Sequence, residues 1–179
     1  MVAVASGDTD PMFLRVAGPA DALAVARVHV RSWQAAYRGL LFDDYLDALE
    51  PEEWALRYSF ADPQATEPIT VLAVEGGEIC GLATIGPAED DERQTVGELL
   101  ALYVDPDRRG LGVGRALIQE ARARLARRGF AEACLWVLVG NEWAERFYRL
   151  DGWLPDGSRR PAKVAGFSVE DVRYRRSLP

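Results

Sequence analysis

The segment from Gly97 to Ala121 constrains the fold of this chain most, because it joins a buried strand to a helix through a glycine-rich loop. The apolar run from Leu99 to Val104, followed by an Asp-Pro turn, is typical of a buried strand. Beyond the loop, apolar residues recur at helical spacing from Val113 to Leu125. Three glycines at alternate positions lie where this helix begins. Because helix-start amides are unpaired and glycine lets a ligand approach the backbone, this junction is suited to a pyrophosphate.

The glycines at positions 110, 112 and 114 do not follow the two common nucleotide-binding patterns. The loop lacks the Gly-Lys-Ser/Thr ending of a P-loop, and its GxGxG spacing differs from the GxGxxG of dinucleotide folds. From the glycines alone, a turn that only packs the helix on the strand stays open as an alternative.

The hydrophobic pattern predicts strands and helices along the whole chain. Strands are expected at residues 13–17, 69–75, 78–85, 98–104, 131–138 and 168–175. Helical segments are expected at residues 19–37, 43–49, 51–60, 113–128 and 142–150. The strand–helix–strand–helix passage from 98 to 150 requires a right-handed crossover and therefore a parallel pair of strands. The predicted fold class is α/β: a mixed, mostly antiparallel sheet with helices on both faces and a parallel pair at 98–104 and 131–138.

Composition narrows the classes of function. About half of the 179 residues are hydrophobic, which allows a core of good size. The net charge of -7 argues against nucleic acid as a partner; it would suit a cationic amine, although surplus surface acid commonly serves only solubility. Cys80 and Cys134 each lie in an apolar run, and the single histidine, His29, cannot form a Cys/His cluster. We therefore expect packed, reduced thiols and no metal site.

The first residues lack the basic and apolar regions of a secretory signal, and no run approaches the ~18 apolar residues of a membrane span. These features predict a cytoplasmic protein without a membrane partner. The small, polar residues 1–11 are expected to form a disordered tail, and residues 12–179 one domain.

Two motifs together resemble those of the GCN5-related N-acetyltransferase (GNAT) superfamily. The segment Arg109–Gly114 fits the family's acyl-CoA-binding signature, Gln/Arg-x-x-Gly-x-Gly/Ala, at every fixed position. Downstream, a second family pattern, N-x-x-A-x-x-F-Y-x-x-x-G-F/W, is matched by Asn141, Ala144, Phe147, Tyr148, Gly152 and Trp153. The likeness extends from about Phe13 to the C-terminus, and it implies the GNAT fold with acetyl-CoA as cosubstrate.

The resemblance implies a set of cofactor-binding residues. The backbone of Leu102, Tyr103 and Val104 would line the pantetheine, and an amide there would polarise the thioester carbonyl. Asn141 is either a helix N-cap or a cofactor contact, and these two roles are compatible. The pyrophosphate would be held by Arg109, Gly110, Leu111, Gly112, Val113, Gly114 and Arg115.

Two residues are candidates for catalysis. Tyr148 matches the family tyrosine that protonates the departing thiolate; an aromatic residue packed beside Phe147 is the alternative. Glu98 occupies the position at which some histone-type members of the family place the general base. An acid inside an apolar strand is unfavourable unless it is paired or functional, but a solvated strand end stays an equal alternative.

Trp33 and Tyr37 come from the early helices, which shape the acceptor pocket in the family. Aromatic residues at helical spacing are, however, more often part of a core. Trp136 and Trp143 are expected to be packing residues, and His29 a residue on a helix face rather than a base.

The resulting prediction is an N-acetyltransferase in which a primary amine attacks acetyl-CoA directly within a ternary complex. The acceptor would be a small-molecule amine or a peptide N-terminus. Use of another acyl-CoA and a non-catalytic CoA-binding regulatory module are the alternatives. The family resemblance also allows a homodimer.

Overall fold

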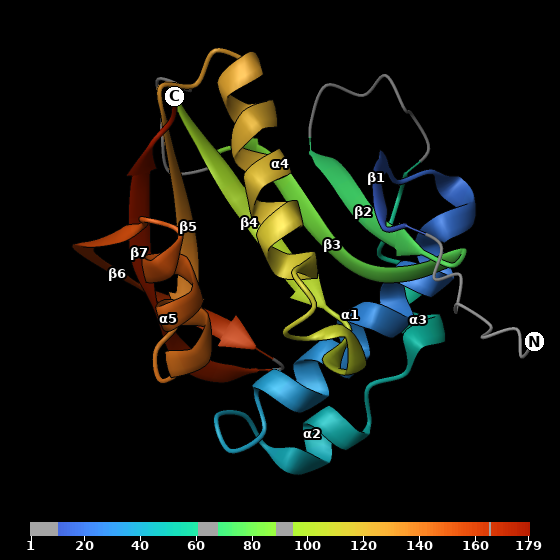
Figure 1. The fold of residues 1–179 in the computed structure, drawn as a ribbon. Coiled ribbons are helices and arrows are strands. Elements are labelled where there is room, and N and C mark those ends of the chain that lie inside the picture. The colour runs from blue at the N-terminus through green and yellow to red at the C-terminus, as the bar shows by residue number, and fades with distance from the viewer. Residues whose placement is uncertain (1–10, 61–67, 89–94, 165) are drawn as a thin grey trace, which may run out of the picture.

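The computed structural model describes residues 11–60, 68–88, 95–164 and 166–179, and their strands form one twisted sheet with helices against it (Figure 1). The strand order is β1-β2-β3-β4-β5-β7-β6. The strands are β1 Phe13–Val16, β2 Ile69–Glu75, β3 Glu78–Pro87, β4 Val96–Val104, β5 Glu132–Leu138, β6 Leu154–Val164 and β7 Phe167–Ser177. The helices are α1 Ala22–Ala36, α2 Asp43–Asp47, α3 Pro51–Ala55, α4 Val113–Arg127 and α5 Glu142–Leu150.

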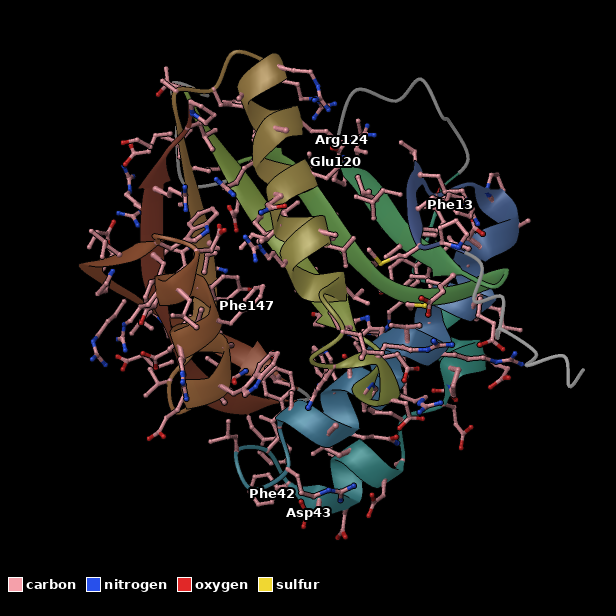
Figure 2. The ribbon with its side chains drawn as sticks, in the orientation of Figure 1. Phe13, Phe42, Asp43, Glu120, Arg124 and Phe147 are labelled. Carbon is pink, nitrogen blue, oxygen red and sulfur yellow. The ribbon has the colours of Figure 1, made fainter. Side chains whose placement is uncertain are left out.

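Helices α1 and α4 cover opposite faces of the sheet, as the alternation along β2 shows. Val71 and Ala73 pack in the cluster that contains the apolar side of α4, whereas Leu72 and Val74 pack in the cluster that contains α1. Successive strand residues point to opposite faces, so a strand that is apolar throughout is buried on both. The outer side of α4 is polar and carries the Glu120–Arg124 ion pair, 2.7 Å between Oε1 and Nε (Figure 2).

The parallel pair is confirmed, and it is short. Strands β4 and β5 pair in parallel only from Val96 to Glu98 on β4 and from Glu132 to Cys134 on β5. All other pairings between the named strands of the described residues are antiparallel. Beyond Glu98 the two strands continue without pairing to each other, so their carboxyl-terminal halves leave a gap in the middle of the sheet.

The pattern analysis missed strand β6. Its sequence contains Pro155, Gly157 and Pro161, which read as turn signals and lower strand propensity. The strand is tolerated because it lies at the edge of the sheet, where one side of its backbone needs no strand partner. Its pairing with β7 shifts register between Pro155 and Arg159.

The third helix is shorter than expected, ending at Ala55 and not near residue 60. Tyr58 and Phe60 instead pack against the cluster beneath α1, so tertiary burial overrides the helical pattern. Cys80 and Cys134 are buried and form no disulfide, as expected. The expected tail at residues 1–11 lies outside the described residues except for Pro11. Within the described ranges, no helix combines the length and apolarity needed to cross a membrane.

Candidate active site

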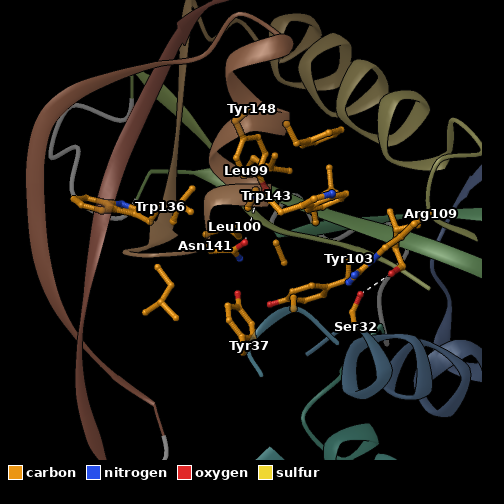
Figure 3. Close-up of a pocket in the computed structure, with 18 residues that line it drawn as sticks. Ser32, Tyr37, Leu99, Leu100, Tyr103, Arg109, Trp136, Asn141, Trp143 and Tyr148 are labelled. Carbon is orange, nitrogen blue, oxygen red and sulfur yellow. Dashed lines mark hydrogen bonds between the residues drawn. The ribbon is translucent and has the colours of Figure 1, made fainter. Parts of the chain in front are cut away.

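The gap between β4 and β5 opens into a pocket of about 760 Å³, including space open to solvent (Figure 3). Four elements and one loop contribute to what we call the first pocket. It is lined by Ser32 and Ala36 of α1, the C-cap residue Tyr37, Leu99–Val104 of β4, Trp136–Leu138 of β5, Arg109, and residues 141, 143, 144, 147 and 148 at and within α5.

This pocket links the two faces of the sheet. Tyr148 belongs to the core cluster that includes α4, whereas Tyr37 packs with α2 on the face covered by α1. Both side chains nevertheless line the same pocket. Two molecules could therefore approach from opposite faces and meet in the gap.

The wall formed by β4 is irregular. Thr84 of β3 pairs with Ala101 and Ile85 pairs with Leu99, which leaves Leu100 as an extra, bulged residue. Bulges re-aim backbone and side chains and are common beside functional sites. The bulge is followed by Leu102, Tyr103 and Val104, whose side of the backbone toward β5 faces the pocket. The Val104 carbonyl accepts a hydrogen bond from the Ser32 hydroxyl at 2.6 Å, which ties the end of β4 to α1.

The glycine-rich loop adopts a backbone that requires glycine. Gly110 and Gly112 have φ of 77° and 88°, in the left-handed region that favours glycine. Gly112 is the N-cap of α4, and its carbonyl accepts the hydrogen bond from the Ala116 amide. The amides at positions 113 to 115 are therefore in the first turn, where helices lack internal acceptors and carry positive partial charge. Such a terminus can bind a phosphate group.

Gly114 differs from these two glycines, since its φ is not positive. A Cβ at this position would lie 3.4 Å from the Phe147 ring and 3.5 Å from the Val104 side chain. Phe147 extends from α5 toward α4 (Figure 2). A methyl group at this position would make only ordinary van der Waals contacts, and the start of α4 lies close to α5 and to the end of β4.

Arg109 lines the first pocket, with its guanidinium 5.2 Å from the ring centroid of Trp143. Trp143 is 57% exposed and stacks in parallel on Phe147, so it packs on a neighbouring ring, as expected, and it also lines the first pocket. Arg115 is exposed and does not line the pocket, although it lies in the first turn of α4. The exposed side of the loop thus combines positive charge with an aromatic surface.

Tyr148 is 9% exposed on α5 and contacts Phe147 edge-on. Burial raises the pKa of its phenol, which therefore stays protonated at neutral pH and can donate a proton. Asn141 is the N-cap of α5, its Oδ1 accepting a hydrogen bond from the Ala144 amide at 3.2 Å. Its capping role is therefore confirmed, and it also lines the first pocket.

Glu98 is 4% exposed, so the alternative of a solvated strand end is wrong. Its side chain alternates with that of Leu99, which packs in the α4 cluster, and it points to the face of α1. Glu98 does not line the first pocket but a second one, of about 620 Å³ including open space, on that face. The second pocket is lined by Trp33, Tyr37, Leu41, Glu98, Leu100, Trp136, Leu138, Arg160, Ala162, Val164 and Asp171.

The two pockets adjoin, because Tyr37, Leu100, Trp136 and Leu138 line both. Of the predicted site residues, the first pocket brings together Tyr37, Leu102, Tyr103, Val104, Arg109, Asn141 and Tyr148. Trp33 and Glu98 line the second pocket only. Gly110, Leu111, Gly112, Val113, Gly114 and Arg115 line neither pocket and form the loop and helix start after β4.

Sequence reasoning missed Asp171 and Arg160, and it assigned Trp136 to packing alone although this ring lines both pockets. Burial raises the pKa of the Asp171 carboxyl, opposed by the charge of Arg160. The argument applied to Glu98, an acid within a strand, could have found Asp171 between Val169 and Val172. Arg160 lies in the strand that the pattern did not predict, so no signal pointed to it.

His29 lies in α1, and its side chain is buried. Its ring stacks on Tyr103 at 4.3 Å between centroids, and its Nδ1 is hydrogen-bonded to the Tyr58 hydroxyl. Burial, together with the charge of Arg57, lowers its pKa to about 3, so it is neutral at physiological pH. Because it lines neither pocket, His29 is not placed to act as a base on a bound ligand.

Comparison with known proteins relates this arrangement to a family. Residues 30–153 match the sequence model of the acetyltransferase (GNAT) family. A probable N-acetyltransferase of Mycobacterium tuberculosis is 30% identical over 175 residues, covering 93% of this chain and 95% of that protein. An uncharacterized N-acetyltransferase of Bacillus subtilis is 31% identical over 117 residues, covering 65% of this chain and 66% of the relative. A mycothiol acetyltransferase of Geodermatophilus obscurus is 34% identical over 100 residues, which cover 55% of this chain and only 32% of that protein.

Solved structures share the fold. PaiA N-acetyltransferase from Thermoplasma acidophilum, in complex with coenzyme A, superposes with a TM-score of 0.73 at 19% identity, covering 94% of this chain and 99% of that one. A putative acetyltransferase from Salmonella typhimurium with its cofactor acetyl-CoA superposes with a TM-score of 0.70 at 18% identity, covering 95% of each chain. The predicted fold class and family resemblance are thereby confirmed: this chain belongs to the acetyltransferase (GNAT) family.

Proposed function

We propose that this protein transfers an acetyl group from acetyl-CoA to a primary amine by direct attack in a ternary complex. The observation that carries the proposal is the gap between β4 and β5, where the first pocket, which is lined from both faces of the sheet, adjoins the second pocket on the face of α1. One pocket leads to a helix start suited to phosphate, and the other contains carboxylates suited to a cation. A thioester and an amine could therefore meet in the gap without a covalent enzyme intermediate.

The residues of the first pocket fit acetyl-CoA. The loop from Arg109 to Gly112 and the first-turn amides of α4 would hold the pyrophosphate, because they combine unpaired donors with positive charge. The side of β4 from Leu102 to Val104 would bind the pantetheine as an added strand binds, through its backbone. Coenzyme A and acetyl-CoA are present in two solved structures with this fold, which supports the assignment.

The chemistry requires three groups of this chain. A backbone amide of β4 near the bulge at Leu100 would donate a hydrogen bond to the thioester oxygen as it gains negative charge. Glu98, directly or through a water molecule, would accept a proton from the ammonium group, so that the neutral amine can attack the carbonyl carbon. When the carbon–sulfur bond breaks, Tyr148 would give its proton to the sulfur, and the second proton lost by the attacking nitrogen would restore the phenol as the amide forms.

The test is release of thiol from acetyl-CoA in the presence of a panel of amines and short peptides, with mass spectrometry of the acceptor. A blank of protein and acetyl-CoA alone controls for reaction of Cys80 and Cys134. Release that depends on an acceptor and adds one acetyl group to its nitrogen supports the proposal. Acetyl-CoA binding without release from any acceptor would instead favour another acyl donor or a non-catalytic module.

A further inference from the structure

The hairpin of β6 and β7 extends one wall of the second pocket beyond the end of β5. Strand β5 ends at Leu138, which is paired with Asp171 of β7. The hairpin continues past this pair by four residues of each strand, roughly 13 Å at the rise of an antiparallel strand. Directly paired residues point to the same face, so the last pair, Val164 and Phe167, continues the pocket-facing side on which Asp171 lies.

The turn between α1 and α2 forms the opposite wall of this part of the pocket. Its residues Tyr37 and Leu41 line the second pocket, and Phe42 follows directly as the N-cap residue of α2. The Phe42 ring lies on the Phe167 ring, with centroids 4.2 Å apart and planes inclined by 33°. These two rings, which we call the aromatic stack, therefore join the outer ends of the two walls.

The turn that carries Phe42 is braced by its own contacts. The Leu40 amide and the next one along the chain both donate hydrogen bonds to the Tyr37 carbonyl at 2.9 Å. Arg38 pairs with Asp47 of α2 at 2.8 Å. The turn also lies against the end of β5, since a Cβ on Gly140 would be 3.0 Å from Cδ2 of Leu40. The aromatic stack is thus held by a turn that is fixed to α2 and to the residues after β5.

The aromatic stack marks where the second pocket ends and solvent begins. Phe42 is 61% exposed and Phe167 37% exposed, and neither of them lines either pocket. An acceptor whose body ends before the stack leaves the two rings in contact. A longer acceptor that follows the hairpin would have to separate the rings and so forfeit the free energy of one aromatic pair. This penalty applies to long acceptors only.

We infer that Phe42 and Phe167 determine the size of the acceptor: amines that end within the second pocket are preferred to long-chain amines and to the N-terminus of a polypeptide. The inference rests on the proposed acetyl transfer and adds the substrate class to it. The nitrogen would reach the gap beside Leu100, which lines both pockets, and the body would extend along the hairpin toward the aromatic stack.

Two pairs of acceptors test this size limit, because the members of each pair differ only in length. Hexylamine is compared with dodecylamine, used below its micellar concentration. The dipeptide amide Ala-Ser-NH2 is compared with an octapeptide amide of the same repeat, which spans roughly 26 Å when extended. In each pair that is accepted, we expect kcat/KM for the short member to exceed that for the long member by about tenfold, the effect of losing one aromatic pair.

Removal of either ring should abolish the preference. In Phe42→Ala and in Phe167→Ala the ratio of short to long acceptors should fall to about twofold or less, and the double variant should lower it no further because the contact is already lost. Phe13→Ala is the matched control. Phe13 is also an exposed phenylalanine, but it lies on β1 at the opposite edge of the sheet from β6 and lines neither pocket, so the ratio should not change (Figure 2).

Failure of the inference can be told from failure of the acetyl transfer. Equal kcat/KM for short and long acceptors in the native protein would overturn the inference and leave acetyl transfer standing. A preference that persists in both alanine variants would do the same, even if the efficiency with all acceptors fell, because the rings would then have a structural role alone. Absence of thiol release with every acceptor would contradict the acetyl transfer itself, and the inference with it.

Discussion

The two pockets that adjoin at the gap are built differently. The first is formed mainly by the stretch from Leu99 to Tyr148, and its proposed ligand contacts are largely backbone amides. The second collects side chains from α1, β4, β5, β6 and β7, separated by up to 138 positions, from Trp33 to Asp171. Backbone recognition depends on the fold, which relatives share, whereas side-chain recognition can change with single substitutions. We therefore regard the first pocket as the family's part of the site and the second as this protein's own.

The largest effect is expected at Tyr148 of the first pocket. Tyr148→Phe removes the proposed proton donor without changing the packing of the ring, so kcat should fall about 100-fold while acetyl-CoA binding is retained. Steady-state kinetics and calorimetric titration measure the two quantities. Tyr45→Phe, which alters a tyrosine that lines neither pocket, is the matched control. Unchanged turnover in Tyr148→Phe would contradict the acid assignment.

Lower pH is expected to destabilise the fold through His29, whose ring stacks on Tyr103 of β4. Because the pKa of His29 is lowered from 6.5 to about 3 in the fold, the unfolded chain binds a proton more readily than the folded chain. The unfolding free energy therefore keeps its full value above pH 6.5 and falls as the pH is lowered toward 3. Between pH 7 and pH 5 the loss amounts to about 2 kcal/mol. In urea denaturation, the His29→Gln variant, which has no titrating group at this position, should lose about 2 kcal/mol less unfolding free energy than the native protein between pH 7 and pH 5. Equal losses in both proteins would rule this out.

Two glycines that flank α4 allow the effect of a substitution on cofactor binding to be distinguished from its effect on backbone strain. Gly112 and Gly129 lie at opposite ends of α4 with φ of 88° and 91°. Substitution of either by Ala should lower the free energy of unfolding by about 1–2 kcal/mol. Only Gly112→Ala should also raise KM for acetyl-CoA, by about fivefold, the effect of about 1 kcal/mol at a helix terminus. If Gly129→Ala raised this KM equally, the loop would not be the phosphate site.

A smaller effect is expected at the mouth of the first pocket. Trp143→Ala removes the ring beneath the Arg109 guanidinium and should raise KM for acetyl-CoA about threefold, as expected for an exposed cation–π contact of 0.5–1 kcal/mol. The KM for the amine should not change, because Trp143 does not line the second pocket. Leu154→Ala, which alters another exposed apolar residue, on β6, controls for general surface effects. A change confined to the amine KM would reverse the assignment of the two pockets.

The hydrophobic pattern predicted most helices and strands, because their buried apolar residues recur at regular spacing. Helices α4 and α5 have apolar stripes at helical spacing and end at Gly129 and Gly152, and their bounds agree with prediction to within one residue. Prediction failed where neighbours decide the conformation. Strand β6 contains two prolines that only an edge position tolerates, and the chain after Ala55 leaves the helix because Tyr58 packs beside His29.

The sequence by itself determined the fold class, the family and the position of the glycine-rich loop that we propose as the phosphate site, because these depend on periodicity and on contiguous motifs such as Arg109–Gly114. The tertiary structure decided how far β4 and β5 pair, that Glu98 is buried on the face opposite α4, and that Asp171 and Arg160 share its pocket. Those features depend on strand register and on the bulge at Leu100. Register joins residues distant in the chain, so no local pattern could specify which charges would meet.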